Sequence, residues 1–268
     1  MANTHIYYKQ WQPQDDQKAV LVLVHGLAEH CHRYEPLAAY LSKHNIAVSS
    51  MDLPGHGRSD GIRGHIDSFE KYQTAVLDLV EKTKLQFPDT PLFLLGHSLG
   101  GLISSKFLLE HQSYFQGALL SGAALQTPQE PPAWQQTIIK VIAKLFPKTK
   151  ILPLDASKVS RDQEVVDAYY ADPLVGHEKL SARFLVSMIN TMTEVKNNAD
   201  KINIPLLIMH GTSDVITSPS GSQWLHQAIS SKDKTLNMYD GLYHEIFNEP
   251  EGPQIFSEMR DWIERHVT

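Results

Sequence analysis

The stretch Pro91-Leu-Phe-Leu-Leu-Gly-His-Ser-Leu-Gly-Gly101 decides the fold of this chain. Its first half is a short, continuous apolar run, which is typical of a strand buried on both faces of a parallel sheet. The pattern Gly-x-Ser98-x-Gly follows at once, and residues 99–111 then carry apolar side chains at helical spacing. A glycine-rich turn also fits the pentapeptide alone. Strand, tight turn and helix in this order predict a nucleophile elbow with Ser98 at its tip.

A serine hydroxyl needs a base, and an acid that orients the base, to act as a nucleophile near neutral pH. On such a sheet the partners follow in the order Ser, Asp, His, each after a later strand. Asp214 follows the apolar run 204–211, and His244 follows the run 234–239. Taken singly, Asp214 also fits a turn or a helix cap, and His244 is one of 14 histidines. Their joint order predicts the catalytic triad Ser98, Asp214 and His244.

Two backbone amides are expected to form an oxyanion hole. One is the amide of Leu99, which follows the nucleophile at the start of its helix. The other comes from the loop after an earlier strand, here the apolar run 20–25, and we predict the amide of Leu27. His25 at the end of that run is interpreted as structural rather than chemical.

Length and composition describe one large globular α/β domain with an insertion. The chain has 268 residues, of which 42% are hydrophobic and 20% charged, enough for a substantial core. A net charge of −6 argues against nucleic acid as a partner. The single cysteine, Cys31, excludes an internal disulfide and fits a small packed side chain better than a thiol nucleophile. With no apolar run near the roughly 18 residues of a membrane span and no signal-peptide pattern, a cytoplasmic protein is expected.

Strands and helices alternate through most of the chain, which predicts a mostly parallel central sheet flanked by helices on both faces. The expected strands are 6–11, 20–25, 46–51, 92–95, 116–120, 205–210 and 235–239, and the expected helices are 33–44, 68–86, 99–111, 220–229 and 254–266. The alternation breaks over 123–198, where prolines punctuate helical stretches and no strong strand pattern is present. We therefore predict a core formed by 1–122 and 199–268, with 123–198 as a helical cap over the active site.

One stretch of the predicted cap has a basic amphipathic pattern. Residues 134–146 carry apolar side chains at helical spacing, and Lys140, Lys144, Lys148 and Lys150 have no acid near them in the sequence. A basic amphipathic helix can lie in a lipid interface, which would give the protein peripheral contact with a membrane. The pattern also fits a helix packed on its own core with a solvated lysine face.

Several other runs are more specific than the serine pentapeptide. They are His25-Gly-Leu-Ala-Glu-His-Cys-His-Arg-Tyr-Glu35, Gly55-His-Gly-Arg-Ser59, Leu95-Gly-His-Ser-Leu-Gly-Gly101, Tyr169-Tyr-Ala-Asp-Pro173 and Tyr243-His244. With these motifs, the chain resembles the monoacylglycerol lipase group of the serine α/β-hydrolases nearly from end to end, least through the cap.

The resemblance implies an α/β-hydrolase fold and cleavage of one fatty acyl chain from glycerol by the triad and amides above, without cofactor or metal. It also implies that glycerol is bound by the polar residues Glu29, Arg33, Tyr34, His97 and Tyr169. Family members often have glycine or alanine where this chain has Leu27, which leaves the preferred acyl length open.

Other functions fit the same residues. A lysophospholipase, a general carboxylesterase and a hydrolase of carbon–carbon bonds would all use this triad, because the scaffold hosts many chemistries. A non-catalytic binding protein would have no use for a serine, acid and base in this order. A phosphodiester head group favours a cationic pocket, and Glu29 near the site disfavours it, so the expected partner is a neutral lipid ester. The oligomeric state stays open.

Overall fold

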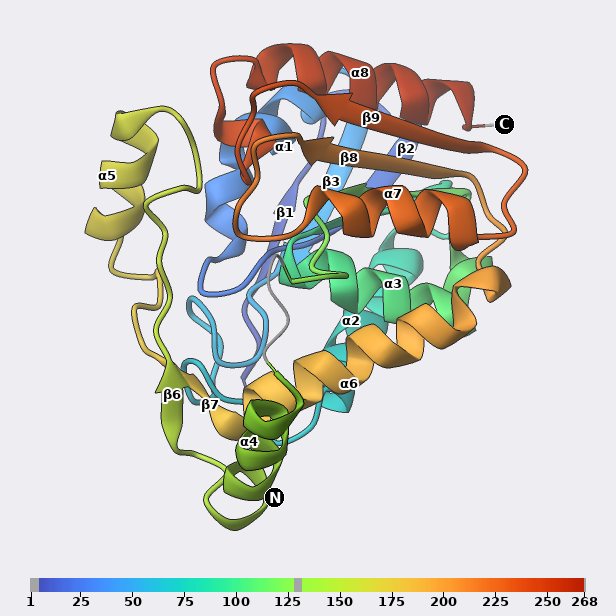
Figure 1. The fold of residues 1–268 in the computed structure, drawn as a ribbon. Helices are drawn as coiled ribbons and strands as arrows, with labels where there is room; N and C mark the ends of the chain where they lie inside the picture. The colour runs from blue at the N-terminus through green and yellow to red at the C-terminus, as the bar shows by residue number, and fades with distance from the viewer. Residues whose placement is uncertain (1–4, 128–131, 268) are drawn as a thin grey trace.

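The computed structural model describes residues 5–127 and 132–267. Its centre is a seven-stranded sheet in the order β1-β3-β2-β4-β5-β8-β9 (Figure 1). The strands are β1 (Tyr8–Trp11), β2 (Ala19–Val24), β3 (Ile46–Met51), β4 (Leu92–His97), β5 (Gly117–Ser121), β8 (Leu206–Gly211) and β9 (Lys234–Tyr239). β1 pairs with β3 in the antiparallel sense, and the other pairs of this sheet are parallel. The predicted mostly parallel sheet is confirmed.

The register of the sheet brings the ends of its central strands to one edge. β2, β3, β4, β5 and β8 are buried along their whole length, which explains the continuous apolar runs of β2, β4 and β8. Val24 pairs with Gly96, and Gly211 pairs with Tyr239. The loops that follow β2, β4, β8 and β9 therefore leave the sheet together, at the edge where open α/β sheets build their sites.

Helices cover both faces of the sheet (Figure 1). One face packs against α1 (Glu35–Ser42) and α8 (Gly252–Arg265), and the other against α2 (Glu70–Gln86), α3 (Leu99–His111) and α7 (Pro219–Ala228). Short 3-10 turns are η1 (Cys31–Tyr34), η2 (Gln112–Tyr114), η3 (Ala199–Lys201) and η4 (Ile246–Asn248). The predicted helix 33–44 starts as η1 and becomes α-helical at Glu35, because Pro36 in the first turn suits an α-helix start.

Residues 123–198, called here the inserted segment, stand between β5 and β8 in the chain, and their elements from α4 to α6 run along the left and lower sides of Figure 1. Their elements are α4 (Ala133–Leu145), β6 (Lys150–Leu152), α5 (Gln163–Ala171), β7 (Leu180–Ser181) and α6 (Ala182–Asn198). β6 and β7 form an antiparallel ribbon that the sequence did not indicate, because strands of three and two residues are too short to show alternation. α6 is fixed to the core by Lys106 of α3, whose ammonium lies 2.7 Å from Glu194.

Lys150 departs from the prediction that grouped it with three solvated lysines. It lies on β6 rather than on the helix, and its ammonium donates a hydrogen bond to the Arg63 carbonyl near the Glu178 carboxylate. Within the described ranges, no helix has the length and apolar character needed to cross a bilayer.

Candidate active site

The predicted elbow is present between β4 and α3. Ser98 has φ 54° and ψ −118°, a conformation that L-residues rarely adopt and that stores strain. A Cβ at Gly96 would lie 2.5 Å from the Gly100 carbonyl oxygen, and a Cβ at Gly100 would lie 2.1 Å from the Val24 carbonyl oxygen. Both positions must therefore be glycine for strand and helix to approach so closely.

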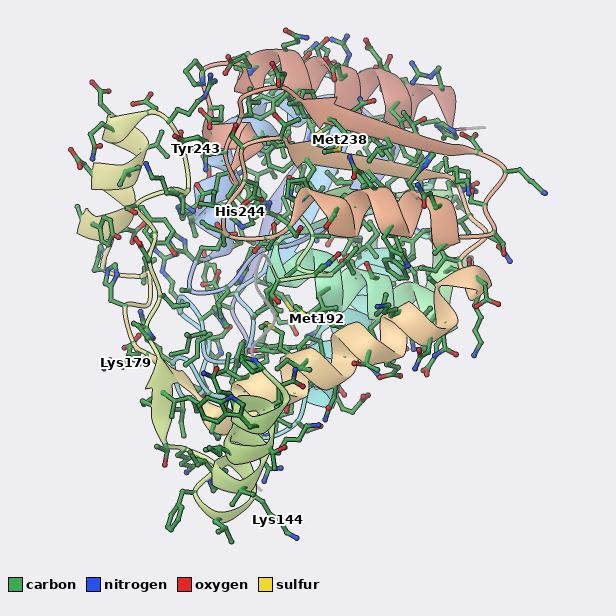
Figure 2. All side chains as sticks on the ribbon, viewed as in Figure 1. Lys144, Lys179, Met192, Met238, Tyr243 and His244 are labelled. Carbon is green, nitrogen blue, oxygen red and sulfur yellow. The ribbon has the colours of Figure 1, made fainter. Side chains whose placement is uncertain are left out.

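The three predicted triad residues meet at the edge of the sheet. His244 Nε2 lies 2.8 Å from Ser98 Oγ, and His244 Nδ1 lies 2.7 Å from Asp214 Oδ2. All three side chains are buried. Figure 2 places His244 on the loop after β9, on the side of the core that faces the inserted segment. The arrangement allows a proton to pass from the serine to an imidazole that a carboxylate orients.

Asp214 has further partners that the sequence did not single out. His210 Nε2 lies 3.0 Å from its Oδ2, and the Thr217 hydroxyl donates to the same oxygen at 2.8 Å. The amides of Ile216 and Thr217 donate to Oδ1 at 2.8 and 3.0 Å. His210 sits inside a buried apolar strand, where a histidine carries no separate signal. The sequence signal that could have indicated its contact with Asp214 is its position four residues before that aspartate.

The charges in this network favour an ionised acid and a basic imidazole. Burial alone would raise the pKa of Asp214, but His244 and His210 outweigh burial and hold it far below its usual range. Burial alone would lower the pKa of His244, but the Asp214 carboxylate outweighs burial and raises it. Burial and the nearby His244 lower the pKa of His97 to about 4, so this neighbour is neutral at pH 7. Asp214 thus accepts from Nδ1, which leaves Nε2 of neutral His244 to accept the serine proton.

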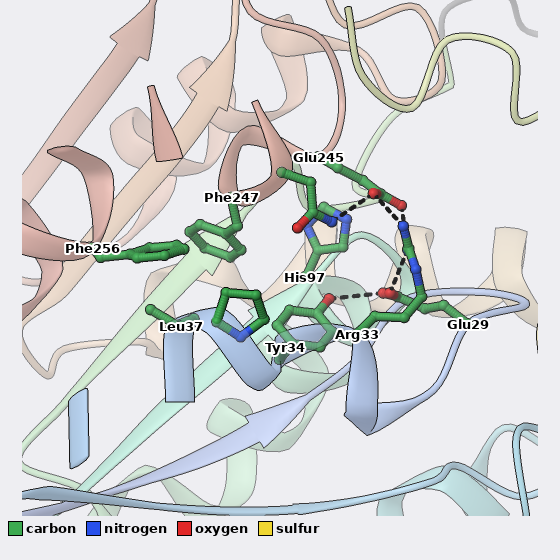
Figure 3. Close-up of a pocket in the computed structure, with 10 residues that line it drawn as sticks. Glu29, Arg33, Tyr34, Leu37, His97, Glu245, Phe247 and Phe256 are labelled. Atoms are coloured by element: carbon green, nitrogen blue, oxygen red, sulfur yellow. Dashed lines mark hydrogen bonds and ion pairs between the residues drawn. The ribbon is translucent and has the colours of Figure 1, made fainter. Parts of the chain in front are cut away.

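A buried ionic cluster, drawn in Figure 3, includes Glu245, the residue directly after His244. The Arg33 guanidinium donates to Glu29 at 3.0 Å and, through two parallel bonds of 2.6 and 2.7 Å, to Glu245. Glu29 also accepts from the Tyr34 hydroxyl at 2.7 Å and from the Gly26 amide at 2.6 Å. Sequence reasoning missed Glu245, because a glutamate directly after the histidine resembles any charged loop residue.

The five residues that the resemblance assigned to glycerol divide into two groups. Glu29, His97 and Tyr169 line the cavity that holds Ser98. Arg33 and Tyr34 lie behind Glu29 and line a smaller neighbouring pocket instead. The guanidinium of Arg33 is 4.6 Å from the centre of the Tyr169 ring, and it also bonds Glu29. Arg33 therefore contacts two of the cavity residues, Glu29 and Tyr169.

The cavity at Ser98 has a volume of about 90 Å³ and is lined by both polar and apolar residues. The polar lining residues are Glu29, His97, Tyr169, Glu245 and Asp155, and the apolar ones are Leu27, Leu154, Ala156, Val159 and Ile216. The inserted segment supplies residues of both kinds. Among residues 5–127 and 132–267, no hydrogen bond uses the amide of Leu27 or of Leu99. In the same ranges, no group of three or more His, Cys, Asp or Glu side chains could hold a metal ion.

Residues 15–251 match the protein family described as serine aminopeptidase, S33. The monoacylglycerol lipase of Mycolicibacterium smegmatis is 35% identical over 267 residues, which cover 100% of this chain and 95% of that protein. The monoglyceride lipase of Mus musculus is 32% identical over an alignment that covers 98% of this chain and 88% of that protein. The crystal structure of Paleococcus ferrophilus monoacylglycerol lipase aligns with a TM-score of 0.88 and 32% identity, over 98% of this chain and 99% of that one. The chain therefore belongs to the serine α/β-hydrolase family that contains the monoacylglycerol lipases.

Proposed function

We propose that this enzyme cleaves monoacylglycerol to a fatty acid and glycerol through an acyl-enzyme intermediate. The observation that carries the proposal is the unbroken contact from Ser98 through His244 to Asp214, beside a cavity lined by both polar and apolar residues. The relatives named monoacylglycerol or monoglyceride lipase match over nearly the full chain and support the substrate class.

In the first step, His244 takes the proton of Ser98 while the serine oxygen attacks the ester carbonyl carbon. The amides of Leu27 and Leu99 donate to the resulting oxyanion, and the N-terminus of α3 adds its dipole. As the carbon–oxygen bond to glycerol breaks, His244 gives its proton to the departing alkoxide. The products of this step are free glycerol and an ester between Ser98 and the fatty acid.

In the second step, His244 takes a proton from water, and the hydroxide attacks the acyl-enzyme carbonyl. The bond to Ser98 breaks, the serine oxygen recovers its proton from His244, and the fatty acid leaves. Asp214 stays ionised throughout and stabilises the imidazolium that forms in each step.

Glycerol fits the polar residues that line the cavity. The Glu29 and Glu245 carboxylates offer acceptors for its hydroxyl groups, and Tyr169 offers a hydroxyl. Arg33 and Tyr34 act as positioning residues behind Glu29. The carboxylates of Glu29 and Glu245 outnumber the single Arg33 guanidinium that they share, which disfavours an anionic phosphate beside them. A lysophospholipase is therefore the weaker alternative.

A carboxylesterase acting on short acyl esters is the second candidate. The observation that favours it is the small cavity of about 90 Å³, with Leu27 in its lining. We propose that residues 123–198 form a cap over the active site. A long acyl chain then requires this cap to move away from Leu27.

We propose further that the cap meets a lipid surface through α4. Trp134, Ile138, Val141 and Leu145 are 62%, 49%, 52% and 62% exposed and follow each other at spacings of four, three and four residues. This apolar stripe faces solvent, whereas the buried Ala143 on another face of α4 packs against the body, where Arg183 donates to its carbonyl. Lys140, Lys144 and Lys148 are exposed beside it, and Figure 2 draws Lys144 pointing away from the body. The enzyme would then be a cytoplasmic protein with peripheral membrane contact.

The deciding experiment compares kcat/KM for a monoacylglycerol, a lysophospholipid and a short p-nitrophenyl ester. We expect the monoacylglycerol to be preferred, and Ser98→Ala to abolish the activity and labelling by a fluorophosphonate probe. A preference for the short ester would favour the carboxylesterase. Hydrolysis that survives in Ser98→Ala would contradict the proposed nucleophile.

A further inference from the structure

The loop that carries His244 is fixed by a short piece of the cap. Cap residues 158–161 lie between β6 and α5, and they contact the loop 243–249. The amide of Glu245, directly after His244, donates to the Val159 carbonyl with a nitrogen–oxygen distance of 2.7 Å. The residue that follows the proposed base is therefore bonded to the cap backbone.

The Glu249 carboxylate makes a second link to the cap. Its side chain is 0% exposed, so its oxygens need donors from the protein itself. One oxygen accepts from the Tyr243 amide at 2.9 Å, and the other accepts from Arg161 Nε at 3.0 Å. The Arg161 amide also approaches both oxygens, at 3.2 and 3.3 Å. Because Tyr243 directly precedes His244, one buried carboxylate joins the cap to the other side of the base.

Arg161 donates hydrogen bonds to two carboxylates, of which one is buried and the other exposed. Arg161 Nε bonds the buried Glu249, whereas its NH2 group bonds Glu251, whose side chain is 43% exposed. An exposed ion pair contributes little to stability, but a charge-assisted bond to a buried carboxylate fixes that carboxylate in place. Glu251 thus offers a natural control on the same arginine.

We propose that Arg161 of the cap is a positioning residue for His244, acting through Glu249 and the backbone on both sides of the histidine. The imidazole must keep contacts of 2.8 Å to Ser98 and 2.7 Å to Asp214 at once. A shift of about 1 Å in such a geometry can lower a rate by about a hundredfold. The inference rests on the proposed triad and adds that the cap holds the base as well as covering the cavity.

A merely structural clamp and a positioning clamp differ in one measurable quantity, kcat per working site. A structural clamp changes the amount of folded enzyme and leaves each folded site as fast as before. A positioning clamp slows each site. End-point labelling with a fluorophosphonate probe counts the sites, and a short, soluble p-nitrophenyl ester removes any effect of lipid surfaces.

The test uses Arg161→Gln, Arg161→Lys and Glu249→Gln, with Glu251→Gln as the matched control. We expect Arg161→Gln and Glu249→Gln to lower kcat per titrated site by about tenfold, with KM within about twofold. Arg161→Lys keeps the cation and should retain more of kcat than Arg161→Gln. Glu251→Gln should stay within about twofold of the wild type, because its partner bond is exposed.

A wild-type kcat per titrated site in Arg161→Gln would overturn the inference, and so would an equal loss in Glu251→Gln. A change confined to KM would also overturn it, because the clamp would then serve substrate binding alone. Should Glu249→Gln fail to fold, the Arg161 series decides, since that side chain is 35% exposed. A wild-type enzyme that the probe does not label would instead remove the proposed nucleophile, and the two failures are thereby told apart.

Discussion

The guanidinium of Arg33 forms two parallel hydrogen bonds with the carboxylate of Glu245, at 2.6 and 2.7 Å. These residues lie 212 positions apart in the chain, and they join the loop after β2 to the residue next to the proposed base His244. Burial would raise the pKa of Glu245, but Arg33 outweighs burial and lowers it, so the carboxylate stays ionised. Arg33, which also bonds Glu29 of the cavity lining, is thereby joined to the residue next to His244.

Replacing Arg33 by methionine should reduce both stability and activity. The change leaves the Glu29 and Glu245 carboxylates buried without their cation, and breaking such a pair lowers the free energy of unfolding by about 3–5 kcal/mol. We expect kcat/KM for a monoacylglycerol to fall by about a hundredfold, because both carboxylates lose their fixed positions. Arg33→Lys keeps the charge without the two parallel bonds, so its stability and kcat/KM should lie between those of the wild type and of Arg33→Met. Urea unfolding that shifts by less than about 1 kcal/mol in Arg33→Met would contradict this account.

The pH profile should report the raised pKa of His244. Only the neutral imidazole can accept the Ser98 proton, so kcat/KM should decline as pH falls through that pKa. Because the pKa is raised, the midpoint is expected above 6.5. Stability depends on pH in the opposite direction to activity. The raised pKa of His244 stabilises the folded protein fully below the pKa of the unfolded chain, and this stabilisation is lost as pH rises through the pKa of the folded protein. Titration of the His244 ring by NMR in Ser98→Ala checks the assignment, and a midpoint at or below 6.5 would disprove it.

Glycine at position 98 should yield a more stable but inactive protein. Ser98 has φ 54° and ψ −118°, where strain of about 1–3 kcal/mol is stored and glycine is tolerated. Glycine is freer than serine in the unfolded chain, which offsets about 0.4–1 kcal/mol of the stabilisation gained by releasing this strain. A net gain of about 1 kcal/mol in the free energy of unfolding is therefore expected for Ser98→Gly. Ser98→Ala keeps the Cβ and the strain, and it should be inactive without this gain. Equal stability of the two variants would argue against strain at the elbow.

Binding of the enzyme to anionic vesicles should depend on α4 and on salt. Each lysine near an anionic surface contributes about 1 kcal/mol, so replacing Lys140, Lys144 and Lys148 by glutamine should weaken co-sedimentation about a hundredfold. Lys150→Gln is the control, because its ammonium already bonds the Arg63 carbonyl. Insertion of the apolar stripe should also shift the fluorescence of Trp134 to the blue. Unchanged sedimentation of the triple variant would exclude the lysine contribution.

Much of this architecture could be predicted from local patterns. Buried strands such as β4 and β8 leave continuous apolar runs, and α3 begins and ends as expected at Leu99 and His111. The elbow needs glycine on both sides of Ser98 because neighbouring backbone leaves no room for a Cβ, so its motif is fixed in the sequence itself. The short ribbon of β6 and β7 escaped prediction, because its strands are held by pairing rather than by a pattern of their own.

The sequence by itself determined the sheet, the elbow and the order of Ser98, Asp214 and His244, because steric limits and apolar periodicity act over a few residues. Tertiary structure alone decided that His210 also contacts Asp214, that Glu245 pairs with Arg33, and that Arg161 reaches Glu249. It also decided that the apolar stripe of α4 faces solvent. These relationships depend on where separate loops meet in space, and buried charges find partners by proximity after folding, which no local pattern encodes.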